Sequence, residues 1–353
     1  MECRRSGAPS PRGFPLCGIR FPQVFNAALP YPIDRQPLTH VGSFPSLHLC
    51  KRMHALEKKY SMSEPQNIIA IVYDFDHTLS PHYMQDLTIL RRAGIAPSEF
   101  WPSCSKLIQE RGYDQELAYM KRMLEHESIR SLSNADLHAM GSDLAFFPGV
   151  PDFFQELNAT VQQSRYAEWD IHLEHYVVSS GLKAILDGSR IAKYVKGIFG
   201  CEFDEEDGHI SFPRRTISHT QKTQFLFRVN KGLLNMNQDV NDHMPEEARR
   251  VPFRHMIYVG DGPTDVPCFT VIKKNGGLAV AVYNPEDTTR KSFKKCYDLA
   301  RHADRVHFMA PADYQTGSQL RLILEQHLSE IADGMVERRR QAIEGTRVPA
   351  PLP

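Results

Sequence analysis

The sequence predicts an α/β protein, a doubly wound parallel sheet into which a small all-helical segment is inserted. Short apolar, mostly β-branched runs without polar alternation, at 68–73, 175–178 and 256–259, are typical of parallel strands buried on both faces. Segments with helical periodicity separate these runs, and this alternation favours a doubly wound sheet. Between residues 82 and 146 only helical patterns occur, which indicates an inserted helical subdomain.

The run Ile68–Tyr73 is the central strand of the predicted sheet, and the other elements follow it in order. Further strands are expected at 175–181, 197–203, 256–260, 278–282 and 306–309. Helices are expected at 84–94, 97–112, 114–126 and 133–144 in the insertion, and at 151–164, 182–194, 218–229 and 319–332 in the core. The acidic, glycine-ended segment 204–208 predicts a β-hairpin turn, and 235–253 is expected to be an irregular loop.

These patterns set the domain boundaries that we expect. Residues 66–81 and 147–333 form the sheet core, and residues 82–146 form the helical cap inserted into it. Residues 334–353 are charged and then Pro-rich, so we expect a flexible tail.

The first 61 residues differ in composition from the rest of the chain. They are rich in Pro and Arg and show no sustained periodicity, so they cannot bury enough apolar surface to offset their ordering entropy. We expect an extension that is disordered and dispensable for catalysis. An organellar transit peptide and a true start at Met62 or Met53 stay open as alternatives.

The composition excludes several classes of protein. Lys plus Arg and Asp plus Glu both number 42 among 353 residues, so the basic excess of a nucleic-acid or membrane-surface protein is missing. Apolar runs stay far below the roughly 20 residues that span a bilayer. Seven cysteines without a C-x-x-C pair indicate reduced thiols in a cytoplasmic compartment. The oligomeric state stays open, with a homodimer among the options.

Two aspartates, Asp74 and Asp76, directly follow the central strand. Residues i and i+2 of a strand lie on one side, so both carboxylates are expected to face one site. Two carboxylates at such a short distance repel each other unless a cation or a shared proton lies between them. Mg²⁺ is a suitable cation because it prefers oxygen ligands. Taken alone, the pair fits a simple turn cap equally well.

Three further positions extend this pattern. Ser179 follows the second buried strand, Lys222 lies near a helix start, and Asp261 and Asp265 follow the strand 256–260. A helix cap, a solvated lysine and ordinary turn chemistry would explain each position singly. They do not explain the joint order of acid pair, hydroxyl, lysine and acid pair. Phosphoryl transfer through an aspartyl-phosphate requires these groups together.

With these motifs the chain resembles the haloacid dehalogenase (HAD) superfamily of hydrolases over about residues 66–333. The resemblance implies a Rossmann-like HAD core with a cap between the first two motifs, as in phosphoserine-phosphatase-like members. The four motifs are Asp74-Phe75-Asp76-His77-Thr78-Leu79, Val177-Val178-Ser179-Ser180-Gly181, Lys222, and Gly260-Asp261-Gly262-Pro263-Thr264-Asp265.

The resemblance also implies roles for the acids. Asp74 would be the nucleophile and a Mg²⁺ ligand, and Asp76 the general acid/base whose backbone carbonyl also binds the metal. Asp261 would bind Mg²⁺ directly, and Asp265 would act through a bound water or by orienting Lys222.

Ser179 and Lys222 would bind the transferring phosphoryl group. One departure from the family is His77, where most members have a small residue. A second departure concerns the acidic residue that binds the substrate amine in phosphoserine phosphatases. This chain has no clear match for it: Tyr83 lies nearest to the corresponding position, and Asp86 follows a few residues later. Serine phosphate is therefore not favoured as the substrate.

We expect a Mg²⁺-dependent phosphomonoester hydrolase that acts on a small soluble phosphorylated metabolite through an aspartyl-phosphate. A phosphomutase would keep the same residues and remains the alternative, and a non-catalytic binding protein on the same scaffold is a third. Asp76 argues against a true dehalogenase, because dehalogenation has no leaving oxygen to protonate.

Overall fold

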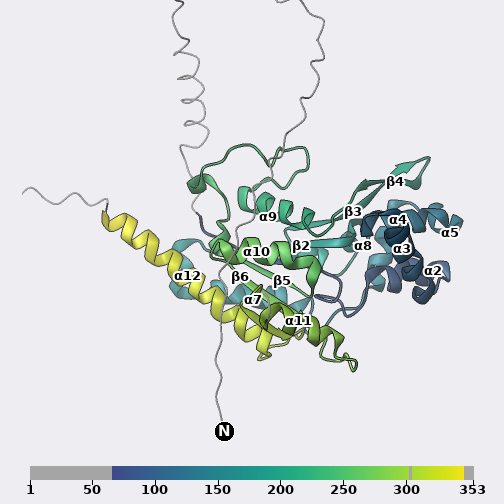
Figure 1. The fold of residues 1–353 in the computed structure, drawn as a ribbon. Helices are drawn as coiled ribbons and strands as arrows, with labels where there is room; N and C mark the ends of the chain where they lie inside the picture. Colours follow the sequence, from purple (N-terminus) through teal and green to yellow (C-terminus); the bar gives the residue numbers. More distant parts are fainter. Residues whose placement is uncertain (1–65, 302–303, 346–353) are drawn as a thin grey trace, which may run out of the picture. The chain divides into compact units, whose positions relative to one another are not determined.

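The computed structural model describes residues 66–301 and 304–345, and its centre is a seven-stranded sheet (Figure 1). The strand order is β4-β3-β2-β1-β5-β6-β7, and every neighbouring pair is parallel except the hairpin β3–β4. The predicted fold class is thus confirmed. The strands are β1 (Ile68–Tyr73), β2 (His172–Leu182), β3 (Gly197–Glu206), β4 (His209–Arg215), β5 (Met256–Gly260), β6 (Leu278–Tyr283) and β7 (Phe308–Pro311).

Strand β1 lies at the middle of the sheet, between β2 and β5. All six of its residues are buried, as expected for an apolar strand covered on both faces. Tyr73 pairs with Val177 of β2 and with Val259 of β5. The chain therefore leaves β1 directly beside the ends of two neighbouring strands, where the predicted motifs lie.

Helices cover both faces of the sheet. Helices α9 and α10 pack on each other and on β2, β5 and β6, while α7 and α12 pack on each other and on β1, β2 and β7 (Figure 1). Within the ranges 66–301 and 304–345, no helix is long and apolar enough to cross a bilayer. The core helices are α7 (Asp152–Val161), α8 (Lys183–Asp187), α9 (Gln221–Lys231), α10 (Val266–Lys274), α11 (Lys291–Arg301) and α12 (Gln319–Gly345).

The inserted segment after β1 is helical, and a capping box at Ser133 starts one of its helices as the sequence suggests. Its first helix contains a π-helical stretch, Asp86–Leu90, and π-turns are frequent at functional sites. The helices of this segment are α2 (Arg91–Ala93), α3 (Pro97–Arg111), α4 (Gln115–Glu125), α5 (Glu127–Arg130) and α6 (Asn134–Ala139).

The hairpin β3–β4 packs against this helical segment (Figure 1). Its turn residues Asp207 and Gly208 both have positive φ, at 53° and 79°, as the tight hairpin turn predicted at 204–208 requires. Ile210 donates its backbone N–H to the Leu132 carbonyl oxygen at 2.7 Å. The sequence did not indicate this contact, because it joins residues far apart in the chain.

Two helical predictions need correction. The helix expected at 182–194 is α8 followed by a separate 3-10 turn at Ala192–Tyr194. Gly188 lies at the break, where a Cβ atom would approach the His138 carbonyl oxygen to 1.7 Å. Helices α10 and α11 were not anticipated.

The closing helix is longer than the sequence analysis expected. Residues 334–345, assigned there to a flexible tail, form the last turns of α12. Met335 and Val336 are buried and continue the apolar stripe of the helix, and Arg338 donates a hydrogen bond to His255 Nε2 at 2.7 Å. Helix α12 therefore remains attached to the core beyond Ala332. The predictions for residues 1–61 lie outside the described residues.

Candidate active site

The first motif turns sharply at the end of β1. Asp74 donates its backbone N–H to the Val259 carbonyl oxygen at 2.9 Å, which continues the pairing with β5. His77 has a φ of 60°, a left-handed conformation uncommon for a residue with a side chain. One carboxylate oxygen of Asp76 accepts a hydrogen bond from Met84 N–H at 2.8 Å, so the first turn of the insertion fixes this side chain.

Lys222 joins the first and last motifs. Its Nζ lies 2.8 Å from Asp74 Oδ1 and 2.8 Å from Asp265 Oδ1, and the lysine side chain is only 1% exposed. Tyr258 from β5 donates its hydroxyl to the same Asp265 oxygen at 2.8 Å. Asp74 follows β1 and Lys222 lies in the first turn of α9, so residues 148 positions apart come into direct contact in this cluster.

The last motif surrounds Asp265. Its second carboxylate oxygen accepts hydrogen bonds from the backbone N–H groups of Asp261 and Gly262 at 3.2 and 3.3 Å. Gly260 makes this turn close: a Cβ atom there would lie 2.5 Å from Asp265 Oδ2. Asp261 in turn lies 2.7 Å from Lys295 Nζ, which comes from α11.

Asp74, Asp261 and Asp265 form a candidate metal site. Each offers a carboxylate oxygen, and these three oxygens lie within 4.8 Å of one another. From the sequence we expected Asp74, Asp261 and the Asp76 carbonyl as ligands, with Asp265 in support. In the structure the Asp265 carboxylate lies close to those of Asp74 and Asp261, while the Asp76 carboxylate accepts a hydrogen bond from the Met84 backbone N–H.

Burial dominates the electrostatics of this site. Burial raises the pKa of Asp74 well above its usual value, Lys222 opposes the shift, and Asp265 and Asp261 add to it. Burial also raises the pKa of Asp76 to about 7. Burial alone would lower the pKa of Lys222, but Asp265 and Asp74 outweigh it and raise that pKa above its usual range.

The charge balance of the cluster fits a divalent cation. When Asp74, Asp261 and Asp265 are ionised, the two ammonium groups of Lys222 and Lys295 leave one negative charge uncompensated, and ionisation of Asp76 adds a second. Carboxylate oxygens are the donors that Mg²⁺ prefers, whereas Zn²⁺ sites usually include His or Cys. The residues present therefore fit Mg²⁺.

Ser179 lies at the end of β2, beside β1, and is buried. Its hydroxyl oxygen accepts a hydrogen bond from Gly181 N–H at 2.9 Å. Ser179 thus lies within the last four residues of β2 with its hydroxyl linked to Gly181, whereas Asp74, Lys222, Asp261 and Asp265 are linked to one another through the contacts above.

A cavity of about 370 Å³ opens beside Asp76, between the inserted helices and the sheet core. We call it the cap cavity. Aromatic rings form part of its wall, with Trp101 at 5.1 Å from Tyr83 and at 6.3 Å from Tyr119 between ring centroids. The residues that line it are Asp76, Tyr83, Gln85, Trp101, Cys104, Ser105, Ile108, Gln115, Glu116, Tyr119 and Ser180.

Sequence reasoning missed two charged residues near the acids. Lys295 stands among several lysines of α11, and nothing in its sequence context separates it from solvated neighbours. Glu116 did carry a signal, because it occupies the buried stripe of α4 with Tyr119, Met120 and Met123 at positions i+3, i+4 and i+7. Asp86, considered earlier as a substrate reader, instead accepts a hydrogen bond from the Trp101 indole at 2.8 Å.

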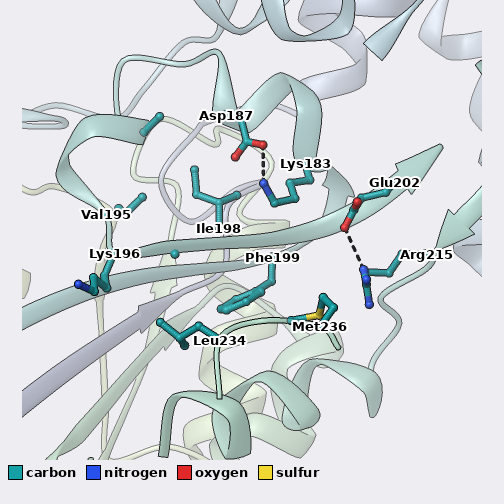
Figure 2. A pocket seen from close by; sticks show the side chains of 12 residues that line it. Lys183, Asp187, Val195, Lys196, Ile198, Phe199, Glu202, Arg215, Leu234 and Met236 are labelled. Atoms are coloured by element: carbon teal, nitrogen blue, oxygen red, sulfur yellow. Dashed lines mark hydrogen bonds and ion pairs between the residues drawn. The ribbon is translucent and has the colours of Figure 1, made fainter. Parts of the chain in front are cut away.

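A second cavity of about 350 Å³ lies along β3 (Figure 2). The four acids of the candidate active site, Asp74, Asp76, Asp261 and Asp265, do not line it. We call it the β3 cavity. Four of its five charged side chains form two pairs: Lys183 contacts Asp187, and Arg215 Nε lies 2.9 Å from a Glu202 carboxylate oxygen, while Lys196 is the fifth. Its remaining lining is largely apolar, with Ile198, Phe199, Leu234 and Met236.

No protein family model matches the chain. An uncharacterized protein of Borreliella burgdorferi is 29% identical over 286 residues, which cover 73% of this chain and 96% of that protein. Its description gives no activity.

Several solved structures are similar to the chain at low sequence identity. A HAD family hydrolase of Salmonella enterica serovar Typhi is 15% identical with a TM-score of 0.47, covering 80% of this chain and 83% of its own. A phosphoserine phosphatase, solved as an analogue of its phospho-aspartyl intermediate, is 17% identical with a TM-score of 0.46, covering 74% and 99%. At these sequence identities and TM-scores the similarity carries no argument about the activity or the substrate of this chain.

Proposed function

We propose that the protein is a Mg²⁺-dependent phosphomonoester hydrolase that works through an aspartyl-phosphate on Asp74. The observation that carries this proposal is the contact of Asp74 with Lys222, beside Asp261 and Asp265, at the edge where the strands end. A carboxylate nucleophile, a buried cation for phosphoryl oxygens and a group of metal-binding acids thereby lie at one place.

In the first step, a carboxylate oxygen of Asp74 attacks the phosphorus atom and the bond to the ester oxygen breaks. Asp76 gives its proton to that leaving oxygen, so the product is a neutral alcohol. A pKa of about 7 suits a group that must donate a proton near neutral pH. Lys222 and the Ser179 hydroxyl hold the phosphoryl oxygens during the transfer.

In the second step, Asp76 is ionised and removes a proton from a water molecule. The water oxygen attacks the phosphorus, the bond to Asp74 breaks, and inorganic phosphate leaves. Asp76 has then regained the proton that it gave in the first step, and both acids return to their starting state.

Asp74, Asp261 and Asp265 would hold the metal ion, with the backbone carbonyl of Asp76 as a further donor. When bound, Mg²⁺ would offset the repulsion between these carboxylates and the phosphate and would polarise the phosphoryl group. Lys295 reduces the charge of Asp261, so metal affinity should depend on this lysine.

We assign the protein to a reducing, cytoplasmic compartment and to a small phosphorylated metabolite as substrate. The cysteines that the structure describes, Cys104, Cys201, Cys268 and Cys296, are buried free thiols, which is consistent with that assignment. The cap cavity has the size of a small-molecule site.

Hydrolysis of p-nitrophenyl phosphate with Mg²⁺, and after its removal by a chelator, tests the proposal. We expect release of nitrophenol and inorganic phosphate with Mg²⁺ and loss of both after chelation. Equal rates with and without metal, or no hydrolysis under either condition, would contradict it. A phosphomutase would instead retain the phosphoryl group and return it to an added acceptor alcohol.

A further inference from the structure

A buried acid in the cap cavity has no role in the chemistry above. Glu116 is 1% exposed, and its Oε2 atom has no hydrogen-bond partner among the described residues. Gln85, which is 3% exposed and lines the same cavity, has an unpartnered Oε1 atom. An unpaired buried acceptor costs about 1–3 kcal/mol, so two of them in one cavity require an explanation.

When Glu116 is ionised, both unpartnered atoms are hydrogen-bond acceptors; burial raises the pKa of Glu116, and a cationic ligand would oppose that shift. A ligand that satisfies them must donate hydrogen bonds, and beside a buried carboxylate it should also carry positive charge. The aromatic wall favours the same ligand, because ring faces attract cations: Tyr83, Trp101 and Tyr119 line the cavity. The hydrogen bond from Trp101 Nε1 to Asp86 fixes the indole at the cavity wall.

The cavity also discriminates against a second anionic group. None of the described residues that line it is Lys, Arg or His. A carboxylate or second phosphate placed there would lie near Asp76 and Glu116, and no cationic side chain of the lining could pair with it; His219, which acts on Glu116 electrostatically, is not part of the lining. Phosphoserine, which carries a carboxylate beside its amine, therefore fits the cavity less well than an amine without one.

The position of the cavity identifies which part of the substrate it would receive. Asp76 lines it, and Asp76 is the residue assigned to protonate the leaving oxygen. Ser180, adjacent to the phosphate-binding Ser179, lines it as well, and its carbonyl oxygen accepts a hydrogen bond from Tyr119 at 2.9 Å. The alcohol released by phosphoester cleavage would thus leave from within this cavity.

We propose that the cap cavity binds the alcohol part of an amino-alcohol phosphomonoester, a substrate with an ammonium group and no carboxylate, and that Glu116 reads the ammonium group. This inference rests on the proposed function and names its substrate class. Glu116 is in this account a specificity residue, because it contacts the part of the substrate that does not react.

The test compares kcat/KM for 2-aminoethyl phosphate and 2-hydroxyethyl phosphate, which differ in the ammonium group alone. The wild-type enzyme should prefer the amine by about tenfold or more, and O-phosphoserine should be a poorer substrate than 2-aminoethyl phosphate. Glu116→Gln should bring the ratio of the two kcat/KM values close to one. Glu125→Gln is the matched control, because Glu125 lies on the same helix but is solvent-exposed.

A second readout needs no variant and guards against misfolding of Glu116→Gln. In wild-type protein, 2-aminoethanol should inhibit p-nitrophenyl phosphate hydrolysis at a lower concentration than ethylene glycol. A wild-type ratio near one together with equal inhibition by the two alcohols would overturn the inference. So would a folded Glu116→Gln variant that keeps the wild-type ratio. Failure of the proposed function is distinct, because then p-nitrophenyl phosphate itself is not hydrolysed.

Discussion

The cap cavity and the β3 cavity are similar in volume, about 370 and 350 Å³, and differ in how their charged groups are satisfied. In the β3 cavity, Lys183 contacts Asp187 and Arg215 contacts Glu202 (Figure 2). In the cap cavity, Glu116 has an unpartnered oxygen. Cavity size alone therefore does not locate a site. Polar groups that the fold leaves unsatisfied are better evidence of an absent ligand.

The ion pairs of the Asp74–Lys222–Asp265 cluster and of the β3 cavity differ in how deeply they are buried. Lys222 is 1% exposed and lies between two carboxylates, whereas Lys183 and Asp187 are about one third exposed, at 32% and 35%. Buried charges cost much to desolvate and persist only where they are paired or functional, while exposed pairs contribute little. Parallel substitutions in the two regions should therefore differ sharply in effect.

The largest expected difference concerns Asp74 and Asp187. Asp74→Asn should reduce kcat for p-nitrophenyl phosphate by about 10³-fold or more, because an amide is a poor nucleophile and a weaker metal ligand. Asp187→Asn, in the β3 cavity, should change kcat less than about twofold, since it contacts no reacting group. Steady-state kinetics of the two purified variants measure this. Comparable losses in both would remove the distinction between the Asp74–Lys222–Asp265 cluster and the β3 cavity.

Next in size is the effect on stability of removing each lysine. Lys222→Met leaves two buried carboxylates without their cation and should lower the free energy of unfolding by about 3–5 kcal/mol. Lys183→Met breaks a partly exposed i,i+4 pair and should cost about 0.3–0.5 kcal/mol. Denaturant unfolding without Mg²⁺ compares them. Similar midpoints for the two variants would show that the Asp74–Lys222–Asp265 cluster is not the buried ion network described.

A third prediction concerns pH and the leaving group. Asp76 must be protonated for the first step, and burial raises its pKa to about 7, so kcat/KM for alkyl phosphates should fall tenfold per pH unit above pH 7. Asp76→Asn should lower this kcat/KM by about 10²-fold and abolish the decline. Rates measured from pH 5 to 9 test both points. A decline that persists in Asp76→Asn would assign the proton to another group.

The smallest expected effect is at Glu202 in the β3 cavity. Glu202→Gln weakens its pairs with Arg214 and Arg215, which are partly solvated, so stability should fall by about 1 kcal/mol or less. Neither kcat nor KM for p-nitrophenyl phosphate should change. Kinetics and thermal unfolding of this variant check both. A clear change in KM would mean that the β3 cavity takes part in substrate binding.

Much of the active site could be predicted from the order of the motifs in the sequence. Asp74 and Asp261 directly follow apolar runs, and parallel strands end at one edge, so their proximity follows from the pattern alone. The closeness of Lys222 to Asp265 depended on the resemblance to the HAD motifs, because a lysine near a helix start has no distinctive local signal. The structure adds the distances, 2.8 Å to each carboxylate.

Other features could not be predicted because they depend on contacts between distant segments. Lys295 becomes distinctive only when α11 brings it to 2.7 Å from Asp261. The last turns of α12 stay folded because Met335 is buried and Arg338 reaches His255, contacts that composition does not reveal. Glu116 could have been noticed as an acid within an apolar stripe, but its cavity is visible only in three dimensions.

The covalent intermediate on Asp74 tests the central claim most directly. Asp76→Asn keeps the nucleophile and the backbone carbonyl, and p-nitrophenol leaves readily without protonation, so the first step should survive while the second loses its base. Rapid mixing of this variant with p-nitrophenyl phosphate and Mg²⁺, followed by acid quenching and peptide mass analysis, measures both. We expect a burst of nitrophenol close to one per active site, and phosphate on the peptide that contains Asp74. No burst, or phosphate on a different residue, would contradict the account.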